Sequence, residues 1–408
     1  MLLDKVRQLV PQLREEVYGK SLVYLDNAAT SLRPLTVVEK WEEMSLKYNA
    51  NLHRAVHYMA DKATGEYEKA RAIVSDYLNA GNCGKVIFTS GATAALNLVA
   101  FCFSELEIGE GDEVIVAQSE HHSDIVPWQM ACARKGAKLV VLPVDDSGQL
   151  RLDMLEGLIV EGKTKIVCVA HISNVLGIIN PIKEIVNICH SKNCAVLADG
   201  AQGIVHTVPD MEDLGCDFYA FSGHKVYAAP GTGVLFARNE WADRMPPYMG
   251  GGEMIETVSW AGTSYAKAPQ KFEAGTQNIS GTPTFGPALE FAKQLRDNEI
   301  EDSYRRIKSF VYDALKSDRR IKLYGDPADL EKKIPLFSIS VEGAHHEDMA
   351  LMLDKMGIAV RSGHMCAEPL MTRFGQTGML RASFAPYNTM EEAEFFIRSL
   401  DKVIKMLA

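Results

Sequence analysis

The sequence predicts an α/β protein whose larger domain has a mainly parallel, seven-stranded sheet between helices, followed by a smaller C-terminal α/β domain. Continuous apolar runs of strand length alternate with amphipathic helical patterns between about residues 60 and 240. Strands that are apolar on both faces are typical of a parallel sheet covered by helices on both sides. After a glycine-rich stretch, a pattern of helices and short strands returns near residue 285, which indicates the second domain.

Seven apolar runs are expected to form the large sheet. In chain order they are residues 85–89, 113–117, 138–142, 165–170, 195–198, 218–221 and 233–236. The last two runs are joined too tightly for a helical crossover, so one of them is expected to be antiparallel. Ligands of such sheets bind at the carboxyl ends of the strands, and the candidate site residues follow these ends.

The domain boundaries follow from the same patterns. We expect a helical segment at 1–20 that packs with the small domain, a large domain at 21–284 and a small domain at 285–408 with strands near 334–341, 358–361 and 380–384. Residues from about 245 to 280 are rich in glycine and lack periodicity. A long structureless stretch of this kind usually serves a site or an interface.

Composition excludes several classes of protein. The 408 residues carry a net charge of −10 without a basic stripe, which argues against nucleic acid as a main partner. The N-terminus lacks the features of a signal peptide, and no apolar run approaches the ~20 residues that span a bilayer. We therefore expect a cytoplasmic protein that does not enter a membrane.

The eight cysteines contain no CxxC pair, so zinc-ribbon and thioredoxin spacings are absent. Most are expected to be reduced core residues of a cytosolic chain. Cys366 differs because it lies between Gly363-His364-Met365 and Ala367-Glu368-Pro369, a pattern that predicts an accessible loop. It is the candidate nucleophilic thiol, although a structural cysteine is the alternative.

Lys225 is the candidate covalent-catalysis residue. It follows the apolar run 218–221 and the residues Ser222-Gly223-His224. An amine just past a buried strand can lose hydration and have its pKa lowered, as a Schiff-base lysine requires. Asp199 ends the preceding apolar run, where an acid could pair with the pyridinium nitrogen of pyridoxal phosphate (PLP). Taken alone, Lys225 could be a surface lysine and Asp199 a helix cap.

Other strand ends complete a pattern. Ser90-Gly91-Ala92-Thr93 opens a helix after a strand, so it could bind phosphate or could simply start a capped helix. His121, followed by His122, could stack on a cofactor, bind zinc or lie in a plain loop. Arg381 could pair with a carboxylate or form a surface ion pair. The order of phosphate turn, histidine, acid and lysine along one sheet favours the PLP interpretation, and the absence of GxxxxGK[ST] disfavours mononucleotides.

The chain resembles the SUF-type (class II) cysteine desulfurases, also described as selenocysteine lyases, which are PLP enzymes of fold type I. The resemblance spans nearly the whole chain. It is carried by residues 24–29, 55–57, 120–122, 125–128, 171–177, 199–202, 221–225, 361–364 and Cys366. Two places depart from the family: Met365 stands where histidine is frequent, and residues 227–233 have an unusual sequence for the expected tight turn.

The resemblance implies a role for each matching residue. Lys225 would hold PLP as a Schiff base, Asp199 would pair with the ring nitrogen, Gln202 would contact the phenolic oxygen, and His121 would stack on the ring and move protons. The phosphate would be held by Ala92, Thr93, Ser222 and His224, with Thr276 from the partner subunit of a homodimer. Asn174 and Arg381 would bind the substrate, and Cys366 would accept its sulfur.

The implied function is conversion of L-cysteine to L-alanine with sulfur transfer to an enzyme persulfide, for iron–sulfur cluster assembly through a SUF-type acceptor protein. L-selenocysteine is the implied second substrate. The alternatives are another fold type I PLP enzyme, such as an aminotransferase or a kynureninase-like lyase, and a non-catalytic metal or iron–sulfur scaffold. The loop thiol argues against the first alternative, and the scattered cysteines argue against the second.

Overall fold

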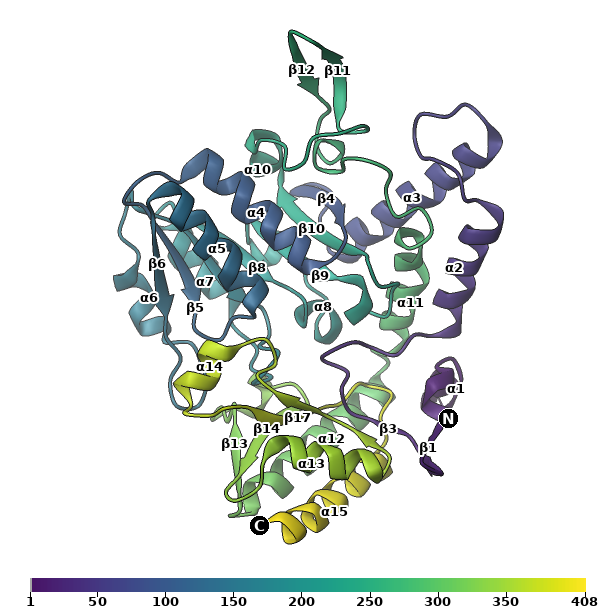
Figure 1. The fold of residues 1–408 in the computed structure, drawn as a ribbon, viewed down its shortest axis with the longest axis vertical. Coiled ribbons are helices and arrows are strands. Elements are labelled where there is room, and N and C mark those ends of the chain that lie inside the picture. The colour runs from purple at the N-terminus through teal and green to yellow at the C-terminus, as the bar shows by residue number, and fades with distance from the viewer. Residues whose placement is uncertain (1) are drawn as a thin grey trace.

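A seven-stranded sheet forms the centre of the larger domain in the computed structural model, which describes residues 2–408 (Figure 1). In chain order its strands are β4 (Gly84–Thr89), β5 (Glu113–Ala117), β6 (Lys138–Leu142), β7 (Thr164–Ala170), β8 (Ala195–Asp199), β9 (Phe218–Ser222) and β10 (Gly233–Arg238). They lie in the order β4-β10-β9-β8-β7-β5-β6. Only β10 runs antiparallel to its neighbours, which confirms the predicted fold class and the predicted antiparallel strand.

Helices cover both faces of this sheet. One face packs on α2 (Leu35–Lys47), α3 (Tyr58–Tyr77), α6 (Leu152–Leu158), α7 (Ile182–His190), α8 (Gly203–His206), α9 (Met211–Leu214) and α11 (Phe285–Gln294), and the other on α4 (Ala92–Glu107), α5 (His122–Lys135) and α10 (Asn239–Arg244). Side chains of β4 alternate between the two cores: Val86 and Phe88 enter the first, and Ile87 enters the second. Burial on both faces explains the continuous apolar runs of the sequence.

The smaller domain is built on an antiparallel sheet with the strand order β13-β14-β17-β16. Its strands are β13 (Ile321–Tyr324), β14 (Leu336–Val341), β16 (Arg361–Gly363) and β17 (Met379–Ser383), and its helices are α12 (Asn298–Ser317), α13 (His346–Lys355), α14 (Glu368–Arg373) and α15 (Met390–Leu407). A separate pair joins β3 (Val23–Tyr24) to β15 (Ile358–Ala359). Strand β13 was not predicted, because a four-residue strand at a sheet edge is too short to show a pattern.

Beyond the predicted boundary at residue 285, the packing changes from the larger to the smaller domain within α12, where Ile300 belongs to the first core and Ile307 to that of the smaller domain. Helix α11 packs on α2 and α3, and its apolar side chains belong to the large core. The N-terminal helix α1 (Leu2–Gln8) contacts both domains, and Leu13 of the following 3-10 turn η1 (Pro11–Arg14) packs in the large core. Arg7 donates to the Tyr387 carbonyl and to Glu392, whereas Val6 packs in the large core.

The glycine-rich stretch contains a hairpin of β11 (Ile255–Ser259) and β12 (Gly262–Tyr265), which projects from the larger domain (Figure 1). The sequence predicted no regular structure there. Both faces of β11 are exposed, so its side chains show none of the alternation that marks a half-buried strand. A second small hairpin pairs β1 (Glu16–Val17) with β2 (Lys20–Ser21). Among residues 2–408, every helix is too short or too polar to cross a bilayer.

Candidate active site

The carboxyl ends of the sheet strands meet the smaller domain at a cavity of about 180 Å³. Ten of the predicted site residues line it: Ala92, Thr93, His121, Asn174, Asp199, Ser222, His224, Lys225, Cys366 and Arg381. The larger domain supplies all of these except the last two. The cavity therefore gathers candidate groups that are far apart in the sequence.

Lys225 follows β9 directly, at the end of the short 3-10 turn η2 (Gly223–Lys225). The turn requires Gly223, because a Cβ there would lie 2.2 Å from Thr232 Oγ1. Burial lowers the pKa of Lys225 below its usual range, and the nearby Asp199 carboxylate acts in the opposite direction. A lowered pKa increases the fraction of neutral amine, which is the nucleophilic form needed for a Schiff base.

Asp199 ends β8 and is 5% exposed. Its Oδ1 accepts the Ala201 N–H at 2.8 Å. Burial raises the pKa of Asp199, while the Lys225 ammonium and the backbone hydrogen bond lower it. A carboxylate held in this way can pair with a protonated ring nitrogen.

His121 is the N-cap residue of α5. The Ser123 N–H donates to His121 Nδ1 at 3.1 Å, so the neutral ring carries its proton on Nε2. Burial, followed by the charge of Lys225, lowers the pKa of His121 to about 4. The imidazole is therefore neutral at pH 7, as a ring that stacks on an aromatic cofactor and exchanges protons should be.

The N-terminus of α4 provides the candidate phosphate site. The N-cap residue, Gly91, supplies no side-chain cap, and the Ala92 N–H donates to Ser222 Oγ at 2.8 Å. Gly233 of β10 lies against this turn, since a Cβ on Gly233 would be 2.4 Å from Gly91 Cα. Backbone N–H groups and the positive end of a 16-residue helix suit a phosphate, so the donor set fits PLP.

Arg381 of β17 is the candidate carboxylate-binding residue. Its side chain is 2% exposed and pairs with Asp26 at 3.0 Å. Its Nη1 donates to the Asn174 carbonyl at 2.7 Å, while its buried Nε lacks a hydrogen-bond partner among residues 2–408. An unused guanidinium donor beside the cavity fits a substrate carboxylate.

Asn174 lies on a loop of the larger domain, residues 173–177, that is held by the smaller domain. The consecutive carbonyls of residues 174–176 each accept one hydrogen bond from a small-domain side chain. In order, the donors are Arg381 Nη1, Ser338 Oγ and Lys333 Nζ, at 2.7, 2.5 and 2.5 Å. The sequence did not predict this role for Ser338 or Lys333, because neither side chain stands in a motif or at a strand end that faces the cavity.

Residues 23–31 form an N-terminal strap across both domains. At its start, β3 pairs with β15 of the smaller domain. The Ala28 N–H donates to Ser383 Oγ, and its carbonyl accepts from Gln202 Nε2 at 2.8 Å. The Ser31 N–H donates to the His224 carbonyl at 3.2 Å. The strap thus contacts the small-domain sheet and the turn that carries Lys225.

Cys366 is exposed and lies on a loop of residues 364–367. Met365 and Cys366 both have left-handed backbone conformations, with φ of 52° and 56°. Each costs about 1–2 kcal/mol, so other contacts must hold the loop. Asn174 Nδ2 donates to the Met365 carbonyl at 2.8 Å. Met365 itself is 3% exposed and packs among apolar residues that include Leu176 and Leu370.

Two predicted site residues do not line the cavity. Gln202 lies behind it and is hydrogen-bonded to the Ala28 carbonyl. Thr276 is exposed and lines a separate hollow beside Ser90. Conversely, Ser123 and Arg361 line the cavity although the sequence did not single them out. Arg361 belongs to a motif that carried the family resemblance, and Ser123 directly follows another, so their position in the sequence was the available signal.

Two buried acids lie beneath His121. Glu120 and Asp124 are both fully buried, and each has one carboxylate oxygen without a hydrogen-bond partner among residues 2–408. Their other oxygens accept the Ala170 N–H and the Trp128 indole N–H. Burial, and then the charge of Asp124, raises the pKa of Glu120 well above its usual range; burial and the charge of Asp199 do the same for Asp124. Both carboxyl groups therefore keep a proton to higher pH than exposed acids do.

The Asp124→Asn protein should resist alkaline unfolding better than the unchanged protein. A group whose pKa is raised on folding contributes stability below its unfolded pKa, and this contribution falls as pH rises toward the folded pKa. Each retained proton costs about 1.4 kcal/mol of unfolding free energy per pH unit in that window. The difference in stability, measured by urea unfolding at pH 6, 7 and 8, should widen with pH. Asp313→Asn, on the exposed side of α12, is the control, and parallel pH profiles for all three proteins would contradict this account.

Comparisons with known proteins identify a single family for this chain. The aminotransferase class-V family model matches residues 23–396. A probable cysteine desulfurase of Vibrio cholerae is 40% identical over 405 residues, which is 99% of each chain. A cysteine desulfurase of Klebsiella pneumoniae is 41% identical over 99% of this chain and 98% of its own.

Solved structures give the same result for the fold. A crystal structure of the Escherichia coli cysteine desulfurase CsdA, in an S-sulfonic acid form, matches with a TM-score of 0.90 at 36% identity and covers 100% of this chain and 99% of that chain. The apo structure of a cysteine desulfurase from Thermococcus onnurineus matches with a TM-score of 0.92 at 36% identity, over 99% and 98% of the two chains.

Proposed function

The chain belongs to the aminotransferase class-V family and is a PLP-dependent cysteine desulfurase, and from this premise we propose that it transfers the sulfur of L-cysteine to the thiol of Cys366. The observation that carries the proposal is that Cys366 and Lys225, from different domains, line one cavity. An aminotransferase or a kynureninase-like lyase would not need a thiol there.

Each group has a task in this proposal. When bound, PLP supplies an electron sink that stabilises negative charge at the Cα of a linked amino acid. Lys225 would hold the cofactor covalently, Asp199 would pair with its ring nitrogen, and Gln202 would contact its phenolic oxygen. Its phosphate would be held by Ala92, Thr93, Ser222 and His224, and the substrate carboxylate by Arg381 with Asn174. His121 would face the ring and exchange a proton at Nε2.

The sulfur step is a displacement at the substrate sulfur. The Cys366 thiolate attacks, a sulfur–sulfur bond forms, and the carbon–sulfur bond of the substrate breaks. The bonding electrons and a proton stay with the carbon fragment, which leaves as L-alanine. The enzyme keeps the sulfur as a persulfide.

Product analysis tests the proposal. The purified protein with PLP should release alanine from L-cysteine, and sulfide should follow in equal amount once a reductant is present. Alanine release without persulfide or sulfide, or an amino-group transfer to a keto acid, would contradict it. The same assay with L-selenocysteine tests the proposed lyase activity, in which selenium leaves more readily than sulfur.

We also propose that the persulfide serves iron–sulfur cluster assembly by passing to a SUF-type acceptor protein. The exposure of Cys366 supports this transfer, because the loop thiol stands where a second protein can reach it. We place the reaction in the cytoplasm, where the eight cysteines, all free thiols here, would stay reduced.

A homodimer is the proposed active form. Thr276, expected at the phosphate of the partner's site, is exposed and lies outside the cavity of its own chain. Met249, which lines the same hollow as Thr276, is exposed as well, and the larger domain also exposes Val56, Tyr58, Val258 and Trp260. Exposed apolar side chains that lie together are typical of a surface that a partner covers.

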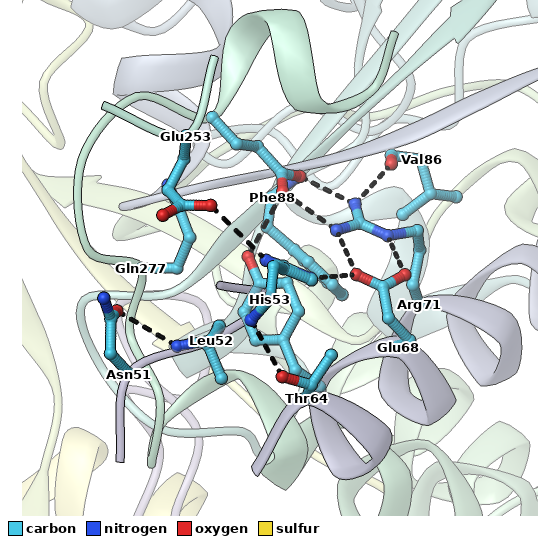
Figure 2. A network of polar contacts seen from close by, with 12 residues as sticks. Asn51, Leu52, His53, Thr64, Glu68, Arg71, Val86, Phe88, Glu253 and Gln277 are labelled. Atoms are coloured by element: carbon cyan, nitrogen blue, oxygen red, sulfur yellow. Dashed lines mark hydrogen bonds and ion pairs between the residues drawn. The ribbon is translucent and has the colours of Figure 1, made fainter. Parts of the chain in front are cut away.

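The segment that carries Thr276 is fixed firmly to the sheet. Figure 2 shows this network, in which Arg71 of α3 pairs with Glu68 and donates to the Val86 carbonyl. Arg71 also binds both oxygens of Glu273, at 2.7 and 2.8 Å, and Glu273 Oε1 accepts the Phe88 N–H at 2.7 Å. Thr276 follows three residues later, so its position is set by buried contacts although its side chain is exposed.

Subunit mixing tests the shared site. Thr276→Val should weaken PLP retention, because the hydroxyl that reaches the partner's phosphate is lost. When this protein is mixed with Lys225→Ala protein, only one site of each mixed dimer has both residues, so about a quarter of the sites should recover. The measurement is cysteine turnover after subunit exchange. A fully active monomer at assay concentration would contradict the proposal.

A further inference from the structure

His122 contacts both sides of Cys366. Its backbone N–H donates to the Cys366 carbonyl at 2.7 Å. Its imidazole Nε2 accepts the Glu368 N–H at 2.9 Å. A single residue of the larger domain therefore binds the chain at the thiol residue and again two residues later.

Helix α14 has no other side-chain cap at its start. Its N-cap residue, Ala367, has no side chain that could accept a hydrogen bond, so the Glu368 N–H would otherwise lack an acceptor from the helix. An N-cap side chain usually accepts the N–H of the second or third helical residue. Here the second residue is Pro369, which has no N–H, and the imidazole accepts the N–H of the first residue instead. The cap is thus supplied by a residue more than 240 positions earlier in the chain.

The loop between these contacts needs such support. Met365 and Cys366 are consecutive non-glycine residues in the left-handed region, a conformation that persists only where the surroundings fix it. Asn174 holds the Met365 carbonyl, and His122 holds the next carbonyl and the next helix. Between these contacts the Cys366 side chain stays exposed at the cavity.

We propose that His122 is a positioning residue that holds the Cys366 loop in its strained conformation and so aims the thiol at the substrate sulfur. The inference rests on the proposed role of Cys366 as sulfur acceptor. His121 faces the cavity, whereas His122 acts on the thiol through the loop. Of the two adjacent histidines, His121 therefore acts in the cavity and His122 positions the residue that accepts the sulfur.

Two substitutions test the acceptor role. His122→Phe keeps a flat ring but has no acceptor, whereas His122→Gln can place an amide oxygen near the position of Nε2. In the PLP-loaded protein, hydrogen exchange of the Glu368 amide should be about fivefold faster with phenylalanine, the usual effect of losing a helix cap, and should return toward the original rate with glutamine. His345→Phe is the matched control, since His345 accepts the Glu347 N–H at the start of α13.

The chemical readout is single-turnover persulfide formation on the Cys366 peptide, followed by mass spectrometry. It should slow with His122→Phe and recover with His122→Gln, while PLP retention and the KM for cysteine stay unchanged. His345→Phe should leave the rate unchanged. Unaltered Glu368 exchange in His122→Phe, or failure of glutamine to restore it, would overturn the inference. A persulfide on another cysteine in the unchanged protein would instead overturn the proposed function, and the exchange data would still decide the role of His122.

Discussion

Replacing Lys225 by alanine should give a folded protein that cannot hold PLP covalently and has lost at least about 100-fold of its cysteine turnover. Lys225 is the one lysine that lines the cavity within residues 2–408. Borohydride reduction followed by peptide mapping of the unchanged protein should find the cofactor on the Lys225 peptide. The same treatment of Lys225→Ala should label no peptide.

Lys333 offers a matched control. It too is buried, 1% exposed, and burial lowers its pKa to about 7, but its Nζ donates to the Leu176 carbonyl outside the cavity. Lys333→Met should therefore retain covalent cofactor on Lys225. Cofactor attached to Lys333, or to any lysine other than Lys225, would refute the assignment.

Replacing Cys366 by alanine should abolish sulfur transfer from cysteine while PLP stays bound and much of any selenocysteine activity remains. Carbon–sulfur cleavage needs a nucleophile to take the sulfur. Cys366 is the exposed cysteine, whereas Cys83 is half-buried and the other six are buried. Burial raises the pKa of Cys83, which lowers the fraction of this thiol that is present as the nucleophilic thiolate.

Mass spectrometry after one exposure to cysteine gives the decisive result. The Cys366 peptide should gain one sulfur atom that reduction removes, and Cys83→Ala should behave like the unchanged protein. Full cysteine turnover by Cys366→Ala would be incompatible with the proposed chemistry. An added sulfur atom on one of the buried cysteines would also contradict the proposed chemistry.

The sequence predicted the larger domain well because its strands are buried on both faces. The seven apolar runs match strands β4 to β10 nearly residue for residue, and the strand ends located Asp199, Ser222 and Lys225. The same physics explains the failures. The hairpin of β11 and β12 is exposed on both faces, so its sequence lacks the alternation of a half-buried strand, and the four residues of β13 are too few to show a pattern.

The sequence predicted which residues line the cavity, but it did not predict the contacts that hold them in place. Motifs identified the groups that line the cavity, yet the donors that hold the Asn174 loop come from Ser338 and Lys333, which belong to no motif. His122 was noted only as the neighbour of His121. Contacts between residues separated by hundreds of positions leave no local pattern, so only the structure reveals them.

The N-terminal strap has a consequence for synthesis on the ribosome. Asp26 pairs with Arg381 and Ala28 with Ser383, partners that lie 355 positions later in the chain. The strap therefore waits, without these partners, until β17 has been translated. The large sheet can form earlier, but a nascent chain that stops short of β17 has an incomplete cavity. Closure of the cavity by Arg381 therefore comes late in synthesis, after the residues of the larger domain that line it are in place.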